Sequence, residues 1–141
     1  MQDTELLQYV HETAEMGIQG LKSLEGRVRD QGLRQALAQQ TEEYRDISAA
    51  AGALLRSYGA EPKTPSLMAR LSSEIMSAVK TLAAPSASNI AEMVIQGNTM
   101  GITKGTRHLN DYAGNDRQTR QLAEKLLRTE EANVAQMKQY L

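Results

Sequence analysis

Apolar residues in the first 58 positions recur at alternating spacings of three and four, which is typical of helices that pack in a bundle. A short polar stretch at 30–32 separates two such series, so together they predict an antiparallel helical hairpin. Asp3 is the expected N-cap of the first helix, and Gly59 is placed to end the second. The two series are Leu7, Val10, Ala14, Gly17, Leu21, Leu24 and Val28, then Leu33, Leu37, Gln40, Tyr44, Ile47, Ala51, Leu54 and Tyr58.

The same spacing returns over 86–141 and predicts a second hairpin. In its first helix Asn89 and Glu92 have the spacing of a capping box. Asn115 or Asp116 is expected to cap the last helix. The two apolar series are Ile90, Val94, Ile95, Ile102 and Leu109, then Ala123, Leu127, Glu130, Val134, Met137 and Leu141.

The connection between the hairpins contains all three prolines and is too long to be a structureless loop in so small a domain. Thr64 followed by Pro65 predicts the start of a helix that extends to about Leu82. Such a helix is about 27 Å long, so it would let the third long helix run parallel to the second. The predicted organisation is one domain, 1–141, with hairpins at 3–58 and 86–141 joined by a crossover at 59–85.

Residues 14–20 and 91–97 form an internal repeat, reading Ala-Glu-Met-Gly-Ile-Gln-Gly and Ala-Glu-Met-Val-Ile-Gln-Gly at an offset of 77. Moving the apolar series of the second helix by 90 positions places it on the series of the fourth, from Ala123 to Leu141. We therefore interpret the two hairpins as a duplication related by an approximate two-fold axis.

Two hairpins, a long crossover after the second helix and an approximate two-fold axis resemble the ferritin-like superfamily. The chain is most similar to small ferritin-like proteins of Gram-positive bacteria, including the group related to spore coat protein F. The resemblance covers nearly the whole chain. It implies an all-α, ferritin-like antiparallel four-helix bundle with a short fifth helix in the crossover.

In metal-binding members of that superfamily, two helices each provide a Glu and two each provide Glu-x-x-His to a pair of iron ions. The corresponding positions here read Gln-x-x-Glu from Gln40 and Glu-x-x-Asn from Glu130, and neither contains histidine. The resemblance thus implies, as an alternative, iron or another divalent metal in a core site that departs from the family pattern. The residues of this alternative site are Glu130, Asn133, Asn98, Gln40, Glu43, Tyr44, Glu15 and Glu92.

Glu130 falls within the apolar series of the last helix, where an unpaired charge is costly, so it needs a partner. Counted from the turn between the last two helices, it faces Asn98, and Gln40 and Tyr44 hold inner positions of the opposite hairpin. We interpret these residues as a hydrogen-bonded polar layer that specifies helix register, with a ligand site as the alternative.

Other candidate residues have simpler interpretations. Glu15 falls on the flank of the apolar face, and Glu92 is expected to act as a capping residue. His11 precedes Glu15 by four positions, which predicts a surface pair along one helix. His108 is expected to be structural or solvated, since no partner is evident in the sequence.

Three glycines recur every four residues in the third long helix, at Gly97, Gly101 and Gly105. Each costs about 1 kcal/mol against Ala in a helix, so some contact must offset the cost. We expect the first helix to approach closely through Gly17 and Gly20, and a kink beside a ligand pocket is the alternative.

Composition excludes several function classes. A formal charge of −1 provides no field for nucleic acid, and the absence of cysteine removes disulfides and thiolate chemistry. No stretch is long enough to span a membrane, and the N-terminus does not resemble a signal peptide, which predicts a cytoplasmic protein. The common glycine-rich, nucleophile and zinc motifs are missing, so no catalytic residue and no cofactor is assigned.

These observations favour a non-enzymatic helical bundle that acts by self-association or partner binding, in a spore or stress setting as the resemblance implies. Met16 and Met93 fall at outer positions and indicate a dimer face. The alternatives are the metal-binding or redox protein described above and a small-molecule pocket at the glycine-lined centre.

Overall fold

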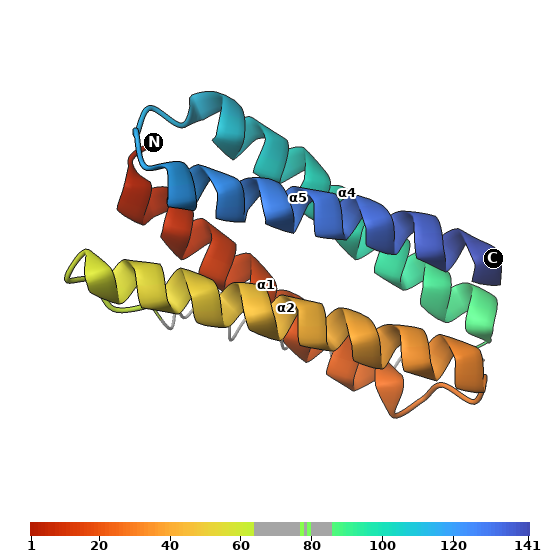
Figure 1. Ribbon diagram of the computed structural model, residues 1–141. Coiled ribbons are helices and arrows are strands. Elements are labelled where there is room, and N and C mark those ends of the chain that lie inside the picture. The colour runs from red at the N-terminus through yellow and green to blue at the C-terminus, as the bar shows by residue number, and fades with distance from the viewer. Residues whose placement is uncertain (64–76, 78, 80–85) are drawn as a thin grey trace.

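The computed structural model describes residues 1–63, 77, 79 and 86–141, and within them the chain forms helices and no strands (Figure 1). The predicted all-α class is therefore confirmed. The elements are α1 (Asp3–Glu25), α2 (Gln31–Ser57), α4 (Ala87–Asp111), α5 (Arg117–Met137) and the short 3-10 helix η1 (Lys138–Tyr140).

The long helices form a four-helix bundle of two antiparallel hairpins, α1–α2 and α4–α5 (Figure 1). Helix α4 runs parallel to α2, as the sequence predicts (Figure 1). Helix α5 contacts α1 and α2 as well as α4, so it joins the two hairpins. The helix predicted from Pro65 to about Leu82 falls on a stretch of which the structure describes only Ser77 and Val79.

The core lies between the four helices and consists mainly of leucine, isoleucine, valine and alanine. Most of the predicted apolar series points into it, but Tyr58 and Leu141 are exposed because they follow the ends of α2 and η1. Near the end of α2 the buried leucine is Leu55, and Leu54 is only half-buried. A strict three-four repeat drifts by about 20° per heptad from a straight helix, which moves the buried position by one residue.

Three helices begin at a polar side chain that accepts a backbone hydrogen bond. Asp30 accepts from the Leu33 amide at 2.8 Å and Ser86 from the Asn89 amide at 3.1 Å. Asp116 accepts from the Thr119 amide at 3.1 Å, and the Thr119 hydroxyl donates to the same oxygen at 2.6 Å. Each cap satisfies an amide that the helix itself leaves unpaired.

Two predicted caps are wrong. Asp3 is the first residue of α1, whose N-cap is Gln2, and its carboxylate accepts a hydrogen bond from the Tyr112 hydroxyl instead. The capping box at Asn89 and Glu92 does not form, because Ser86 is the N-cap of α4 and Glu92 is exposed. Both sequence patterns were compatible with a cap, but Asp3 is bonded to Tyr112 and the amide of Asn89 is already capped by Ser86.

The N-terminus of α1 is tied to the turn between α4 and α5. The amino group of Met1 donates to the Asp111 carbonyl at 2.9 Å, and the Ala113 amide donates to the Met1 carbonyl at 2.9 Å. Together with the Tyr112–Asp3 hydrogen bond, these contacts hold the start of one hairpin against the turn of the other (Figure 1).

No helix in the described part of the chain is both long enough and apolar enough to cross a lipid bilayer.

Asp116→Ala is expected to lower the free energy of unfolding by about 1–2 kcal/mol, because the amide and hydroxyl of Thr119 lose their acceptor at the start of α5. Urea denaturation followed by circular dichroism measures the change. Asp46→Ala, at an exposed position within α2, is the control and should change stability by about 0.5 kcal/mol or less. Equal losses in the two variants would contradict a capping role.

Candidate functional site

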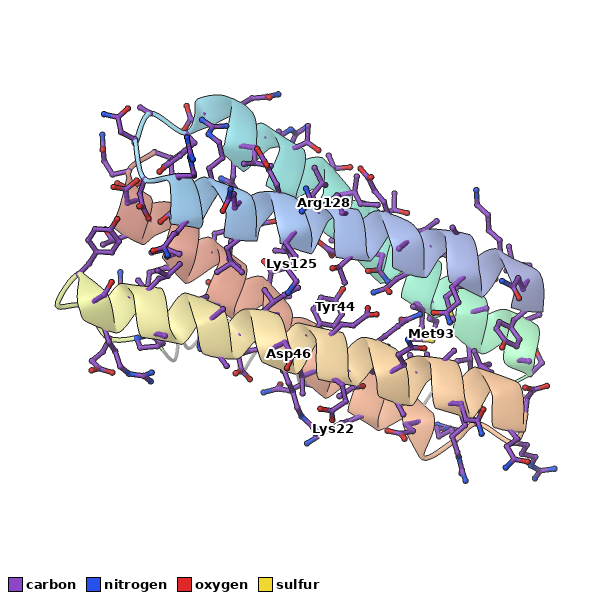
Figure 2. All side chains as sticks on the ribbon, in the orientation of Figure 1. Lys22, Tyr44, Asp46, Met93, Lys125 and Arg128 are labelled. Atoms are coloured by element: carbon purple, nitrogen blue, oxygen red, sulfur yellow. The ribbon has the colours of Figure 1, made fainter. Side chains whose placement is uncertain are left out.

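Five polar side chains are buried together in the bundle: Gln40, Tyr44, Asn98, Glu130 and Asn133, which we call the central polar cluster. They come from α2, α4 and α5. Figure 2 shows Tyr44 in the space between α2 and α5, about midway along the bundle. The polar layer expected from the sequence thus lies in the core, and Asn133 belongs to it.

Hydrogen bonds connect three members of the central polar cluster in one direction. The Tyr44 hydroxyl donates to Asn98 Oδ1 at 2.8 Å, and Asn98 Nδ2 donates to the Val94 carbonyl at 2.9 Å. Glu130 Oε2 lies 3.4 Å from the Tyr44 oxygen. Because the single phenol proton points at Asn98, a hydrogen bond at this third contact needs the proton to come from Glu130. The arrangement therefore suits a protonated Glu130.

Burial also favours the protonated form of Glu130. It raises the pKa of Glu130 to about 8. Burial and the proximity of Glu130 also raise the pKa of Tyr44. Both groups hold their protons at pH 7, so this part of the cluster is electrically neutral.

Two glycines make room for the central polar cluster. A Cβ atom on Gly101 would lie 2.7 Å from Glu130 Cδ, and one on Gly17 would lie 2.7 Å from Tyr44 Cε2. Such separations are too short for van der Waals contact. The expected approach of α1 to α4 occurs at only one of these positions: Gly101 and Gly17 admit side chains and Gly97 faces open space, but a Cβ atom on Gly105 would lie 3.5 Å from the Tyr9 hydroxyl of α1.

Among the residues that the structure describes, three buried atoms of the cluster have no hydrogen-bond partner: Gln40 Oε1, Glu130 Oε1 and Asn133 Nδ2. Gln40 uses its other amide atom to donate to Gln136 Oε1 at 2.8 Å. A buried polar atom without a partner costs about 1–3 kcal/mol. The cluster therefore lowers stability relative to an apolar core. Buried polar groups that fix the register of packed helices commonly have this cost.

The alternative metal site is not assembled from its predicted residues. Glu92 is exposed, Glu43 is half-buried, and Glu15 bonds to Ser48 in a groove between α1 and α2. Within the described residues, no three His, Cys, Asp or Glu side chains are grouped closely enough to hold a metal ion. A single carboxyl among a phenol and amides does not fit a pair of iron ions, which needs several carboxylates and imidazoles.

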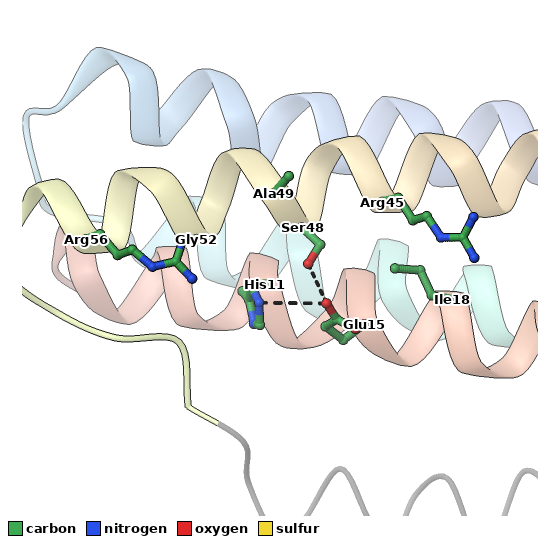
Figure 3. Close-up of a pocket in the computed structure, with 8 residues that line it drawn as sticks. All are labelled: His11, Glu15, Ile18, Arg45, Ser48, Ala49, Gly52 and Arg56. Atoms are coloured by element: carbon green, nitrogen blue, oxygen red, sulfur yellow. Dashed lines mark hydrogen bonds and ion pairs between the residues drawn. The ribbon is translucent and has the colours of Figure 1, made fainter.

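The groove between α1 and α2 has a volume of about 330 Å³ and a polar centre (Figure 3). The Ser48 hydroxyl donates to Glu15 Oε1 at 2.6 Å, and His11 Nε2 lies 3.9 Å from the same oxygen. Burial lowers the pKa of His11, although Glu15 acts against the shift. The predicted pair of His11 and Glu15 is confirmed, and Ser48 is the partner that sequence analysis missed. Arg45 and Arg56 line the groove on either side (Figure 3).

The comparison with protein families gives one match, to the family described as Domain of unknown function (DUF2383), over residues 2–111. The chain belongs to that family. A search of curated proteins and a search of solved structures found no match.

The matched part of this DUF2383 protein ends where α4 ends, so Tyr44 and Asn98 lie inside it while Glu130 and Asn133 of α5 lie outside. Helix α5 nevertheless contacts α1, α2 and α4, and its buried apolar residues are Leu122, Ala123, Leu126 and Met137. Without α5 the bundle would expose a large apolar surface, so the folding unit includes residues beyond the match.

His108 of the DUF2383 protein is structural. Its ring lies 4.1 Å from the Tyr9 ring, centroid to centroid, and burial lowers its pKa. The Tyr9 hydroxyl donates to the Gly101 carbonyl at 3.4 Å, and burial raises the pKa of Tyr9 to about 12. Tyr9 was not a candidate in the sequence because it lies one position before the apolar series at Val10.

The two methionines expected on a dimer face are less exposed than their outer positions predict. Met16 and Met93 are half-buried, and Met93 packs against the core. Among the described helices of the DUF2383 protein, the strongly exposed methionine is Met100 on α4, with 61% of its surface accessible.

Proposed function

We propose that this DUF2383 protein is a non-enzymatic helical bundle that acts by self-association, with a dimer as the favoured assembly. The supporting observation is the exposed surface of α4. No charged residue occurs between Glu92 and Lys104, and Met100 lies in the middle of that stretch. By contrast, the exposed surface of α5 carries several charges, among them Lys125 and Arg128 (Figure 2).

Hydrogen bonding makes this surface of α4 less polar than its composition suggests. The hydroxyls of Thr99 and Thr103 donate to the carbonyls of Ile95 and Thr99, at 2.7 and 3.0 Å. Their hydroxyl donors are thus satisfied within the helix, so the threonines offer methyl groups beside Met100. An uncharged surface of this kind loses little solvation when a partner covers it.

The purified protein is expected to have about twice the mass of one chain when light scattering is measured behind size exclusion. Dilution should shift it towards the monomer, because a surface of one helix gives modest affinity. A monomer mass at the highest soluble concentration would contradict the proposal. Metal analysis of the same sample provides a second check, since stoichiometric iron that disappears in Glu130→Gln would favour the metal-binding alternative.

We further propose that the bundle is ferritin-like and related to small proteins of the spore coat protein F group, with a cytoplasmic role in a spore or stress setting. The two hairpins, the parallel course of α2 and α4 and the repeat at an offset of 77 support the relationship. The half-buried and exposed positions of Glu43 and Glu92 indicate a member in which the metal ligands have been lost.

A further inference from the structure

The exposed surface of α4 carries a mirrored pattern of residues. Six exposed side chains follow one another at spacings of four, three, one, three and four. With 3.6 residues per turn they share a sector of about 100° around the helix. They are Glu92, Gln96, Thr99, Met100, Thr103 and Arg107, which we call the α4 face.

The mirror point of the α4 face lies between Thr99 and Met100. A two-fold axis through that point, perpendicular to α4, would place a second α4 antiparallel to the first. Gln96 would then lie opposite Thr103 of the second copy. At the two ends of the contact, Glu92 would lie opposite Arg107 of the second copy, once on each side.

We propose that a second copy of this chain docks on the α4 face in this antiparallel arrangement, held at its ends by two Glu92–Arg107 ion pairs. The proposal rests on the self-association proposed above and specifies its surface. The two charged positions are about 22 Å apart along the helix, so the other four residues of the α4 face, none of them charged, lie within about four turns. Lys104 is also exposed on α4 but lies outside this sector, about 40° beyond Met100.

The charges at the ends of the α4 face favour an antiparallel over a parallel pairing of two α4 helices. A parallel pairing would set Glu92 against Glu92 and Arg107 against Arg107, and each like-charged contact would be unfavourable. Within the part of the chain that the structure describes, neither side chain has an ion-pair partner of its own. Both charges are therefore available to a second copy.

The small side chains of the α4 face suit close packing of two helices. Thr99 and Thr103 have internally bonded hydroxyls, and Met100 is flexible enough to fill the space beside the axis. The exposed surface of α5 does not offer the same arrangement. Its exposed charges are mainly basic, so an antiparallel pairing of two α5 helices would place mostly like charges together. They are Arg117, Arg120, Lys125 and Arg128, with Glu131 as the exposed acid.

Charge reversal tests the proposed contact. Glu92→Arg and Arg107→Glu are each expected to raise the dimer dissociation constant about tenfold, because two attractive pairs become repulsive. The combined variant restores opposite charges at both ends and should return the constant to near the wild-type value. Glu131→Arg, at an exposed position on α5, is the matched control and should leave it unchanged. Circular dichroism verifies that each variant is folded.

A second measurement uses the absence of cysteine in the natural sequence. Met100→Cys places a single thiol beside the proposed axis, and mild oxidation should link it to the second copy. Lys125→Cys on α5 should remain unlinked under the same conditions. If neither charge reversal changed the dimer dissociation constant and Met100→Cys did not crosslink, the α4 face would not be the contact, although self-association would still hold. A strict monomer would overturn both.

Discussion

Glu130→Gln is expected to stabilise the protein well above pH 8 by up to about 5 kcal/mol more than it does well below pH 4.5. Burial raises the pKa of Glu130 from 4.5 to about 8, and each unit corresponds to about 1.36 kcal/mol. The amide of glutamine can donate to the Tyr44 oxygen as the protonated acid does, so the hydrogen-bonded chain to Asn98 is preserved.

The sign follows from which state holds the proton. Below pH 4.5 the carboxyl is protonated in both folded and unfolded chains, and its contribution to stability is fully present. As pH rises towards 8, the unfolded chain ionises while the folded chain does not, and stability is lost. Above pH 8 both states ionise and the loss levels off. The phenols of Tyr9 and Tyr44, which face Glu130, have raised pKa values and remain protonated throughout.

Urea denaturation of wild type and variant over this pH range measures the difference directly, because the titration of all other groups cancels. Glu131→Gln, at the exposed neighbouring position, is the control for the loss of a surface carboxyl. A constant difference for Glu130→Gln as well would show that the buried carboxyl does not titrate above its ordinary range.

Gly101→Ala is expected to lower the free energy of unfolding by about 2 kcal/mol, although alanine favours a helix by about 1 kcal/mol over glycine. The added methyl group would occupy the place of the Glu130 carboxyl group, since it would lie 2.7 Å from Cδ. Glu130 is only 3% exposed, so its carboxyl has little room to move and would leave its contact with Tyr44. Thermal and urea denaturation measure the loss.

The sign of this effect should depend on Glu130. In a Glu130→Ala background the obstacle is removed, so Gly101→Ala should stabilise by about 1 kcal/mol through helix propensity. Gly97→Ala lies one turn away on the same helix and faces open space, so it should stabilise the wild-type protein by a similar amount. If Gly101→Ala had the same effect with and without Glu130, the two residues would not be in contact.

These two predictions address the same question about the bundle. A carboxyl with two buried polar neighbours lacking partners is a costly way to fill a core. The side chains of the cluster can bond to one another only when α2, α4 and α5 are in one register, because a shift by one turn would separate Glu130 from Tyr44.

The sequence was sufficient for the fold because helical periodicity is a local property. The three-four spacing identified both hairpins, and the same spacing placed Gln40, Tyr44 and Glu130 on inner positions. Turn counting from the second hairpin brought Asn98 to the same level. Each of these inferences needs only the pitch of the helix and the direction of its apolar side.

Contacts between helices were decided by the tertiary structure. The sequence showed glycines at Gly17 and Gly101, but their neighbours, Tyr44 and Glu130, depend on how far each helix is rotated and shifted against the next. Periodicity fixes that rotation only to within about one residue, which is 100° around a helix. For the same reason, the sequence did not predict that Ser48 bonds to Glu15 or that Glu92 is exposed. The sequence therefore determined which residues could meet, and packing of the four helices determined which of them do.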